Sequence, residues 1–210
     1  KTAYEIRLSL VGSEMCIRDS AGLGAVSSPH FRSAIRYGTA LAAWSIDRFL
    51  AGNPVPSADE QPWQLGKPAA TIRSDLVTRA RRALCLSNDE RDDMQEALEG
   101  LGVLLGAWES RPVAGQKRIV ARRWFRESLR LAFVLAPELA SRIETRVGEL
   151  QATSAGIAPE PFVTGDDLIT LGMRPSPKFR SVLDRVLDAQ LEGRVSSKAE
   201  AMELARELGV

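Results

Sequence analysis

Residues 114–135 read AGQKRIVARRWFRESLRLAFVL, the most regular helical pattern in the chain. Apolar residues recur there with a period close to 3.6, which is the repeat of an α-helix. Pro137 follows at a position typical of the first turn of a further helix. The pattern predicts one continuous helix over 114–135, with an apolar side formed by Ile119, Trp124, Phe125, Leu129, Leu131 and Phe133.

Helical patterns also cover most of the chain outside this stretch. Ser87 with Glu90 has the spacing of a capping box, as has Ser197 with Glu200, while Thr164 and Ser176 stand where N-caps are expected. No segment alternates apolar and polar residues over a strand length between hairpin turns. These features predict an all-α fold, with helices over 31–50, 69–84, from 87 onward, 137–155, 164–172, 176–193 and 197–208.

Two composition changes divide the chain. Pro159 and Pro161 mark a linker, which predicts a multi-helix body over 21–157 and a small helical tail over 158–210. Residues 1–20 resemble the translation of a sequencing adapter, so we expect them to be an artefact that makes no designed contacts. The natural N-terminus, and with it a whole domain, is then expected to be missing.

The bulk composition is that of an ordinary globular protein, with 44% hydrophobic and 26% charged residues. No run of 18 apolar residues occurs, so the sequence predicts no membrane span. The only cysteines are Cys16 and Cys85, which argues for a reducing compartment and favours a cytoplasmic address.

Residues for known catalytic chemistry are scarce. His30 is the only histidine, too few for a His-Asp phosphohydrolase site, and we expect it to be a cap or surface residue. The sequence contains neither of two glycine-rich loops that bind nucleotide phosphates, Gly-x-x-x-x-Gly-Lys-Ser/Thr and Gly-x-Gly-x-x-Gly. The pairs Asp92-Asp93 and Asp166-Asp167 resemble magnesium ligands, but they lie in or near first helical turns, where acids are favoured by the helix dipole. No catalytic or metal site is predicted.

Charge is unevenly distributed. Residues 86–110 hold seven acids and one base, whereas residues 111–146 hold nine bases and three acids. On a continuous helix, arginines four residues apart would form a stripe. Such a stripe could bind RNA phosphates, pair with the acidic helix, or stay solvated. The candidate RNA-binding residues are Lys117, Arg118, Arg122, Arg123, Arg126 and Arg130. Trp108 and Trp124 could stack on bases, although core packing is favoured for Trp124.

Particular strings resemble a known family. Residues 163–179 (VTGDDLITLGMRPSPKF), 187–195 (LDAQLEGRV) and 197–201 (SKAEA) are similar to the tail of bacterial tRNA nucleotidyltransferases and poly(A) polymerases. Residues 84–90 (LCLSNDE) look like a helix start of that family, and 116–120 (QKRIV) with 124–129 (WFRESL) look like its Lys-Arg helix. The resemblance covers about residues 70–208.

The resemblance also has gaps. Ser176 stands where the family has the glycine of a Pro-Gly-Pro turn. The catalytic head, with its Gly-Ser and Asp-x-Asp motifs, and the neck that reads the nucleotide have no counterpart.

The resemblance implies a body and tail that hold tRNA, or another structured RNA, for 3′-end addition by a head absent from this chain. The resemblance implies magnesium and CTP or ATP for full-length members of the family. It implies no cofactor for this chain. The resemblance does not distinguish a CCA-adding enzyme from a poly(A)-adding enzyme. The alternative is a helical protein–protein interaction module whose basic face binds an acidic partner.

Overall fold

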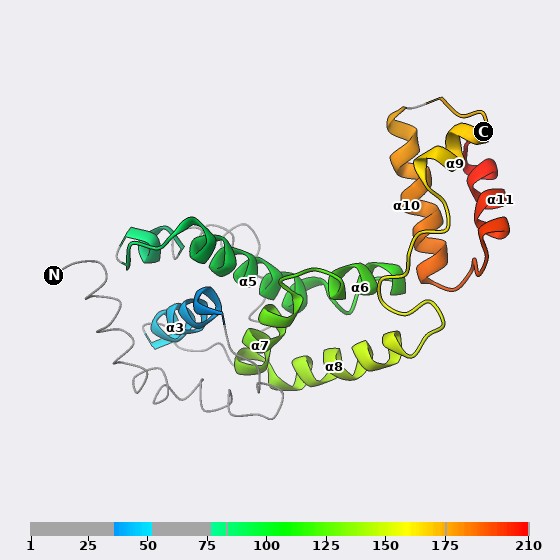
Figure 1. The fold of residues 1–210 in the computed structure, drawn as a ribbon. Coiled ribbons are helices and arrows are strands. Elements are labelled where there is room, and N and C mark those ends of the chain that lie inside the picture. The colour runs from blue at the N-terminus through cyan, green and yellow to red at the C-terminus, as the bar shows by residue number, and fades with distance from the viewer. Residues whose placement is uncertain (1–35, 52–76, 83, 175, 210) are drawn as a thin grey trace. The chain divides into compact units, whose positions relative to one another are not determined.

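A computed structural model describes residues 36–51, 77–82, 84–174 and 176–209. Within these residues the secondary structure is helical, with no strand, which confirms the predicted all-α class (Figure 1). The predictions for residues 1–20, His30 and residues 69–76 lie outside the described residues. The helices are α3 (Tyr37–Ala51), α5 (Asn88–Ala107), α6 (Val113–Val120), α7 (Phe125–Leu135), α8 (Pro137–Gln151), α9 (Gly165–Thr170), α10 (Pro177–Leu191) and α11 (Lys198–Gly209).

The chain divides into two compact units. Unit 1 comprises Lys1–Trp108 and Arg123–Ile143, and unit 2 comprises Glu109–Arg122 and Glu144–Val210. Residues 109–122 and 144–157 group with residues 158–210 in this division. The body and the tail as functional domains stay a prediction.

Unit 1 is built on α5, which contacts both α3 and α7. The predicted capping box begins α5: the Ser87 hydroxyl accepts from the Glu90 amide, and the Glu90 carboxylate accepts from the Ser87 amide at 2.8 Å. The apolar side of this helix is buried and includes Met94, Leu98 and Leu101. Trp108 is also buried, with its ring centroid 6.2 Å from that of Phe125. Trp108 is therefore a core residue rather than a stacking platform for bases.

Gly38 of α3 and Gly100 of α5 each allow a close approach to a neighbouring helix. A Cβ added at Gly38 would lie 2.7 Å from the Met94 backbone nitrogen. A Cβ added at Gly100 would lie 2.2 Å from Ser128 Oγ and 2.3 Å from Cε3 of Trp124. Ser128 is fully buried in α7 and donates to the Ala97 carbonyl of α5 at 3.0 Å. The α5–α7 contact thus depends on the missing side chain of Gly100.

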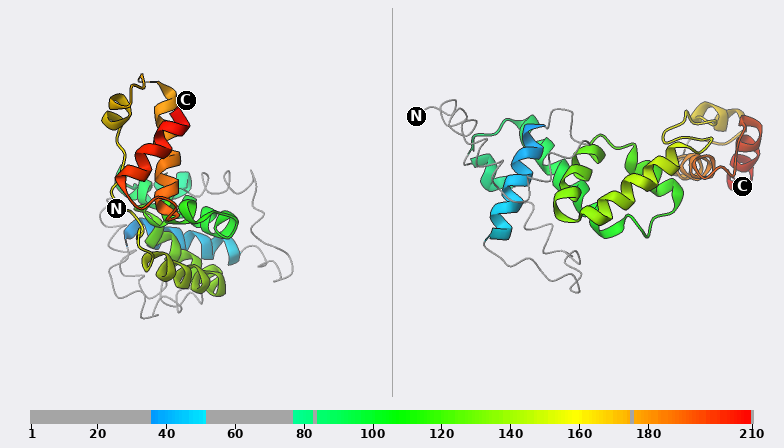
Figure 2. Two further views of the ribbon diagram at one scale, coloured as in Figure 1. Left: turned by 90° about the vertical axis from the view of Figure 1, so that its right-hand side faces the viewer. Right: turned by 90° about the horizontal axis from the view of Figure 1, so that it is seen from below.

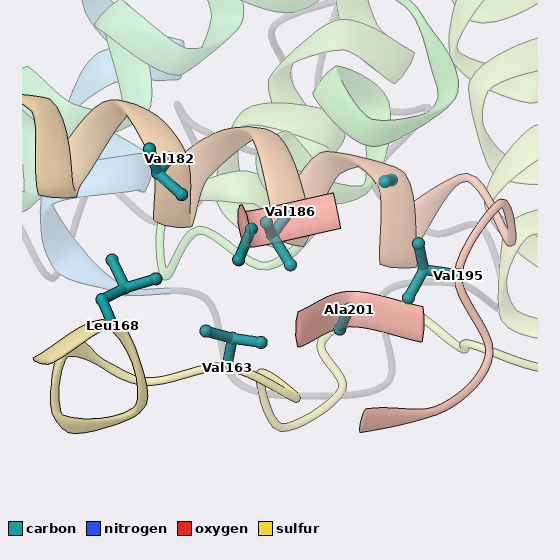
Figure 3. Packing of buried hydrophobic residues seen from close by; sticks show 8 residues of the cluster. Val163, Leu168, Val182, Val186, Val195 and Ala201 are labelled. Atoms are coloured by element: carbon teal, nitrogen blue, oxygen red, sulfur yellow. The ribbon is translucent and has the colours of Figure 1, made fainter. Parts of the chain in front are cut away.

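Unit 2 has its own apolar core, in which α10 contacts α6, α9 and α11. α10 and α11 lie side by side in the further views (Figure 2). Val182 and Val186 of α10 point toward Val163, Leu168 and Ala201 (Figure 3). Val182 and Val186 are buried, so this side of α10 faces the core of unit 2.

The ends of the unit 2 helices follow the sequence signals in most cases. Gly172 and Gly193 have φ of 84° and 75° and end α9 and α10 as predicted, because this left-handed conformation favours glycine. Ser176 is the N-cap of α10, but its side chain makes no cap bond. Ser197 Oγ accepts from the Glu200 amide at 3.3 Å, whereas the Glu200 carboxylate accepts from the amide of Ser196 rather than Ser197.

The continuous helix predicted over 114–135 is wrong. α6 ends at Val120, residues 121–124 form a turn, and α7 begins at Phe125. The amide of Arg122 donates to the carbonyl of Ile119, three residues back. This is the hydrogen-bond spacing of a 3₁₀ turn, so the α-helix ends here. Ile119 is buried in unit 2 and Phe125 is buried in unit 1. The stripe expected from arginines four residues apart is therefore not formed along one helix; those arginines are Arg118, Arg122, Arg126 and Arg130.

Among the described residues, no helix combines the length and the apolar character that crossing a bilayer requires.

Candidate nucleic-acid interface

Lys117 lies inside unit 2 rather than on its surface. The side chain comes from the second turn of α6 and is 0% exposed. Its Nζ donates to Thr153 Oγ1 at 2.7 Å and to the Leu191 carbonyl at 2.8 Å. Leu191 is the last residue of α10 and Thr153 follows α8, so the ammonium sits at the negative ends of two helix dipoles.

The protonated form of Lys117 depends on these two acceptors. Burial lowers the pKa of the Lys117 ammonium below its ordinary value. No carboxylate of the described residues forms a salt bridge with Lys117. Two neutral oxygens therefore stabilise the buried ammonium, a role that an acidic side chain usually has. Lys117 thus links α6 to the end of α8 and to α10.

Arg118, the next residue along α6, also reaches α10. Its Nε donates to Asp188 Oδ1 at 2.8 Å, and its Nη2 donates to the Asp184 carbonyl oxygen at 3.0 Å. The Arg118 side chain is 36% exposed, so each ion pair contributes only modestly to stability. The guanidinium donors of Arg118 are therefore already hydrogen-bonded to acceptors on α10.

Arg123 and Arg130 have partners within unit 1. Arg123 forms a two-pronged bond to the Glu96 carboxylate of α5, and this pairing raises the pKa of Arg123 above its ordinary value. The alternative in which basic residues pair with the acidic helix therefore holds for Arg123. Arg130 is buried and lies 3.5 Å from the Glu127 carboxylate.

Arg122 and Arg126 differ from the other four candidates. Both side chains are exposed, and within the described part of the chain neither makes a salt bridge or a hydrogen bond. Arg122 belongs to unit 2 and Arg126 to unit 1. They are the two predicted residues whose donors are free for a phosphate.

Two of the family-like strings meet in unit 2. Lys117 and Arg118 belong to residues 116–120, and their acceptors Asp188 and Leu191 belong to residues 187–195. In the same string, the buried Gln190 donates to the Glu160 carbonyl at 2.7 Å and accepts from the Phe162 amide at 3.1 Å. Gln190 thereby fixes the proline-rich linker against α10. Sequence reasoning missed this role, since a lone glutamine carries no signal of its long-range partner.

Three of the four paired aspartates have side-chain partners within the fold. Asp92 accepts from Arg91 and Asp93 accepts from Arg36 at 2.8 Å. Asp167 completes a capping box with Thr164 and pairs with Lys198 at 2.8 Å. No group of three His, Cys, Asp or Glu side chains in the described residues is placed to hold a metal ion.

Acid should weaken unit 2 through Asp167. Hydrogen bonds from Lys198 and Thr164 lower the pKa of Asp167 to about 2, below its ordinary 3.8. A depressed pKa contributes stability that is present above the ordinary value and lost as pH falls through the folded value. We expect Asp167→Asn to melt at a lower temperature than wild type at pH 7, with the difference shrinking between pH 4 and 2.

Asp166→Asn is the matched control, because it removes a neighbouring first-turn charge that is exposed. Thermal melting by circular dichroism from pH 2 to pH 7 makes the comparison. A melting difference for Asp167→Asn that stays constant over that range would show that the ion pair with Lys198 is not formed.

Comparison with known proteins gives short matches to three curated relatives. An A-adding tRNA nucleotidyltransferase of Geobacter sulfurreducens is 33% identical over 75 residues, which is 36% of this chain and 8% of that protein. A CC-adding tRNA nucleotidyltransferase of Synechocystis is 42% identical over 52 residues, 24% of this chain and 12% of that protein. An A-adding enzyme of Halalkalibacterium halodurans is 44% identical over 48 residues, 23% of this chain and 11% of that protein.

All three relatives are tRNA nucleotidyltransferases. The similarity supports the resemblance drawn from the sequence, although the matched segments span no more than 12% of the relatives' own length. No family profile matches the chain, and no solved structure is significantly similar to it.

Proposed function

We propose that this chain is an RNA-holding portion of a tRNA nucleotidyltransferase-type protein. In this proposal it binds tRNA while a catalytic head, which has no counterpart in this sequence, extends the RNA 3′ end. The observation that carries the proposal is the similarity to three tRNA nucleotidyltransferases, two A-adding and one CC-adding. Since these names refer to tRNA, the proposal favours tRNA end maturation over poly(A) addition.

The exposed arginines support a phosphate contact. Arg122 and Arg126 present exposed guanidinium groups that have no partner among the described residues, and their planar forks suit phosphate oxygens. Arg123 is paired with Glu96 but remains 65% exposed, so it could exchange its partner for a phosphate. Lys117, Arg118 and Arg130 contribute to RNA binding indirectly in this proposal, by holding the helices that carry the other charges.

The remaining features of the proposal follow from the family. Magnesium and CTP or ATP would be handled by the catalytic head, and the part of the chain that the structure describes offers no cluster of ligands for the metal. A cytoplasmic location fits a tRNA-processing role.

The 210-residue chain should bind tRNA and add no nucleotide to it. Incubation with labelled CTP or ATP, magnesium and tRNA should give a shifted complex on a native gel but no label in the RNA. The expected lack of transfer rests on the absent Asp-x-Asp motif and on the engagement of Asp92, Asp93 and Asp167 by basic partners.

The two outcomes that contradict the proposal differ in meaning. Label in the RNA would show that a catalytic site is present. A chain that folds but gives no complex with tRNA would favour the interaction module with an acidic protein partner.

A further inference from the structure

Met173 completes the hydrogen-bond pattern that ends α9. Its amide donates to the Leu168 carbonyl at 3.1 Å, and the Gly172 amide donates to the Ile169 carbonyl at 2.9 Å, which together make a Schellman motif. Gly172 supplies the left-handed conformation of that motif, with φ of 84°. In such motifs the residue in the position of Met173 often makes an apolar contact with the residue in the position of Leu168. The end of α9 therefore directs the Met173 side chain toward the core.

The same side chain reaches the end of α11. A Cβ added at Gly209, the last residue of that helix, would lie 2.7 Å from Met173 Sδ and 2.9 Å from Met173 Cε. The thioether therefore lies directly against the Gly209 backbone. Met173 also packs against the apolar core of unit 2, which includes Leu168 and Ala205. One thioether thus joins the end of α9, the core and the end of α11.

This thioether lies at the edge of the core rather than inside it. Met173 is partly exposed, as is Met202 of α11, whereas Met94 of unit 1 is fully buried. A small oxidant such as hydrogen peroxide reaches a side chain from the solvent. Exposure therefore favours reaction at Met173 over reaction at Met94.

Oxidation changes a contact of this kind from apolar to polar. The sulfur lone pair attacks hydrogen peroxide, the O–O bond breaks, an S–O bond forms and water leaves. The thioether is oxidised to a sulfoxide while the peroxide is reduced. The new oxygen is a strong acceptor, and burying it without a donor destabilises the fold. The Gly209 backbone leaves little room for the added atom.

We propose that Met173 is a reversible oxidation site at which hydrogen peroxide loosens the packing of α9 and α11 on the core of unit 2. Methionine sulfoxide reductases return the sulfoxide to the thioether, which makes the change reversible. The proposal goes beyond RNA holding and does not depend on it.

The test compares three forms of the 210-residue chain, all carrying Cys16→Ser and Cys85→Ser so that no thiol reacts. They are the parent, Met173→Leu and Met202→Leu. After hydrogen peroxide, peptide mass spectrometry should find the sulfoxide at Met173 and not at Met94. Circular dichroism should show that the parent melts about 3–8 °C lower, and treatment with the sulfoxide reductases should restore its melting temperature. Met202→Leu should lose as much as the parent, and Met173→Leu less than half as much.

Met173→Gln tests the polarity change without an oxidant. Its side chain is polar and of similar length, so it should melt at a lower temperature than Met173→Leu, which stays apolar. Three results would each overturn the proposal. Met173 stays a thioether while Met202 is oxidised, peroxide lowers the melting of Met173→Leu as much as that of the parent, or Met173→Gln melts like Met173→Leu.

Discussion

Replacing Lys117 by alanine is expected to lower the free energy of unfolding by about 3–5 kcal/mol. The side chain is fully buried, and its ammonium donates to Thr153 Oγ1 and to the Leu191 carbonyl. Alanine removes both hydrogen bonds and leaves the space of the methylene stem empty. Urea unfolding followed by circular dichroism measures the loss.

Two control variants separate the causes of that loss. Lys117→Met keeps the buried stem and removes only the donors, so it should lose about 1–3 kcal/mol. Arg122→Ala removes an exposed, unpaired base nearby in sequence and should stay within about 0.5 kcal/mol of wild type. If Lys117→Ala unfolds like wild type but binds tRNA more weakly, Lys117 is a surface phosphate ligand and its fastening role is wrong.

Replacing Gly100 by alanine should destabilise unit 1 by about 1–3 kcal/mol. The new Cβ would meet Ser128 Oγ at 2.2 Å and the Trp124 ring at 2.3 Å, so α5 and α7 would have to separate. Ser128 would then lose its buried bond to the Ala97 carbonyl. The midpoint of urea unfolding should fall.

Gly106→Ala in the same helix is the matched control. Nothing lies within 4 Å of a Cβ added at Gly106, and that position is exposed. Alanine is the better helix former, so Gly106→Ala should stabilise the protein by about 0.5–1 kcal/mol. Gly100→Ala and Gly106→Ala should therefore have opposite signs. Equal stabilisation by both would mean that α5 and α7 are less closely packed than the structure has them.

Local signals predicted the helices well. The capping boxes at Ser87 and Thr164 form because a hydroxyl and a carboxylate three residues apart satisfy each other's neighbouring amides without help from the rest of the fold. The range of α10 was also predictable, because Ser176 and Gly193 mark its two ends. These features depend only on residues close together in sequence.

The break after Val120 could not be predicted from periodicity. Residues 121–124 contain neither glycine nor proline, and the apolar spacing continues through them. The turn becomes favourable because Ile119 and Phe125 pack into different cores, which is a tertiary effect. A sequence pattern cannot report on it.

The sequence indicated where basic residues gather, but it did not indicate which of them have partners within the fold. Lys117 and Arg118 looked like surface cations because their partners lie 74 and 70 residues away. Charge counting could not distinguish them from Arg122 and Arg126, whose side chains remain exposed.

The salt dependence of tRNA binding by the 210-residue chain tests the central claim most directly. An RNA-holding protein that contacts several phosphates should lose affinity steeply between 50 and 300 mM KCl, with a log–log slope of roughly −0.7 to −0.9 for each phosphate neutralised. Arg122→Gln/Arg126→Gln should make that slope shallower by about one to two units while leaving thermal melting unchanged. A folded chain that does not bind tRNA at 50 mM KCl would contradict the account.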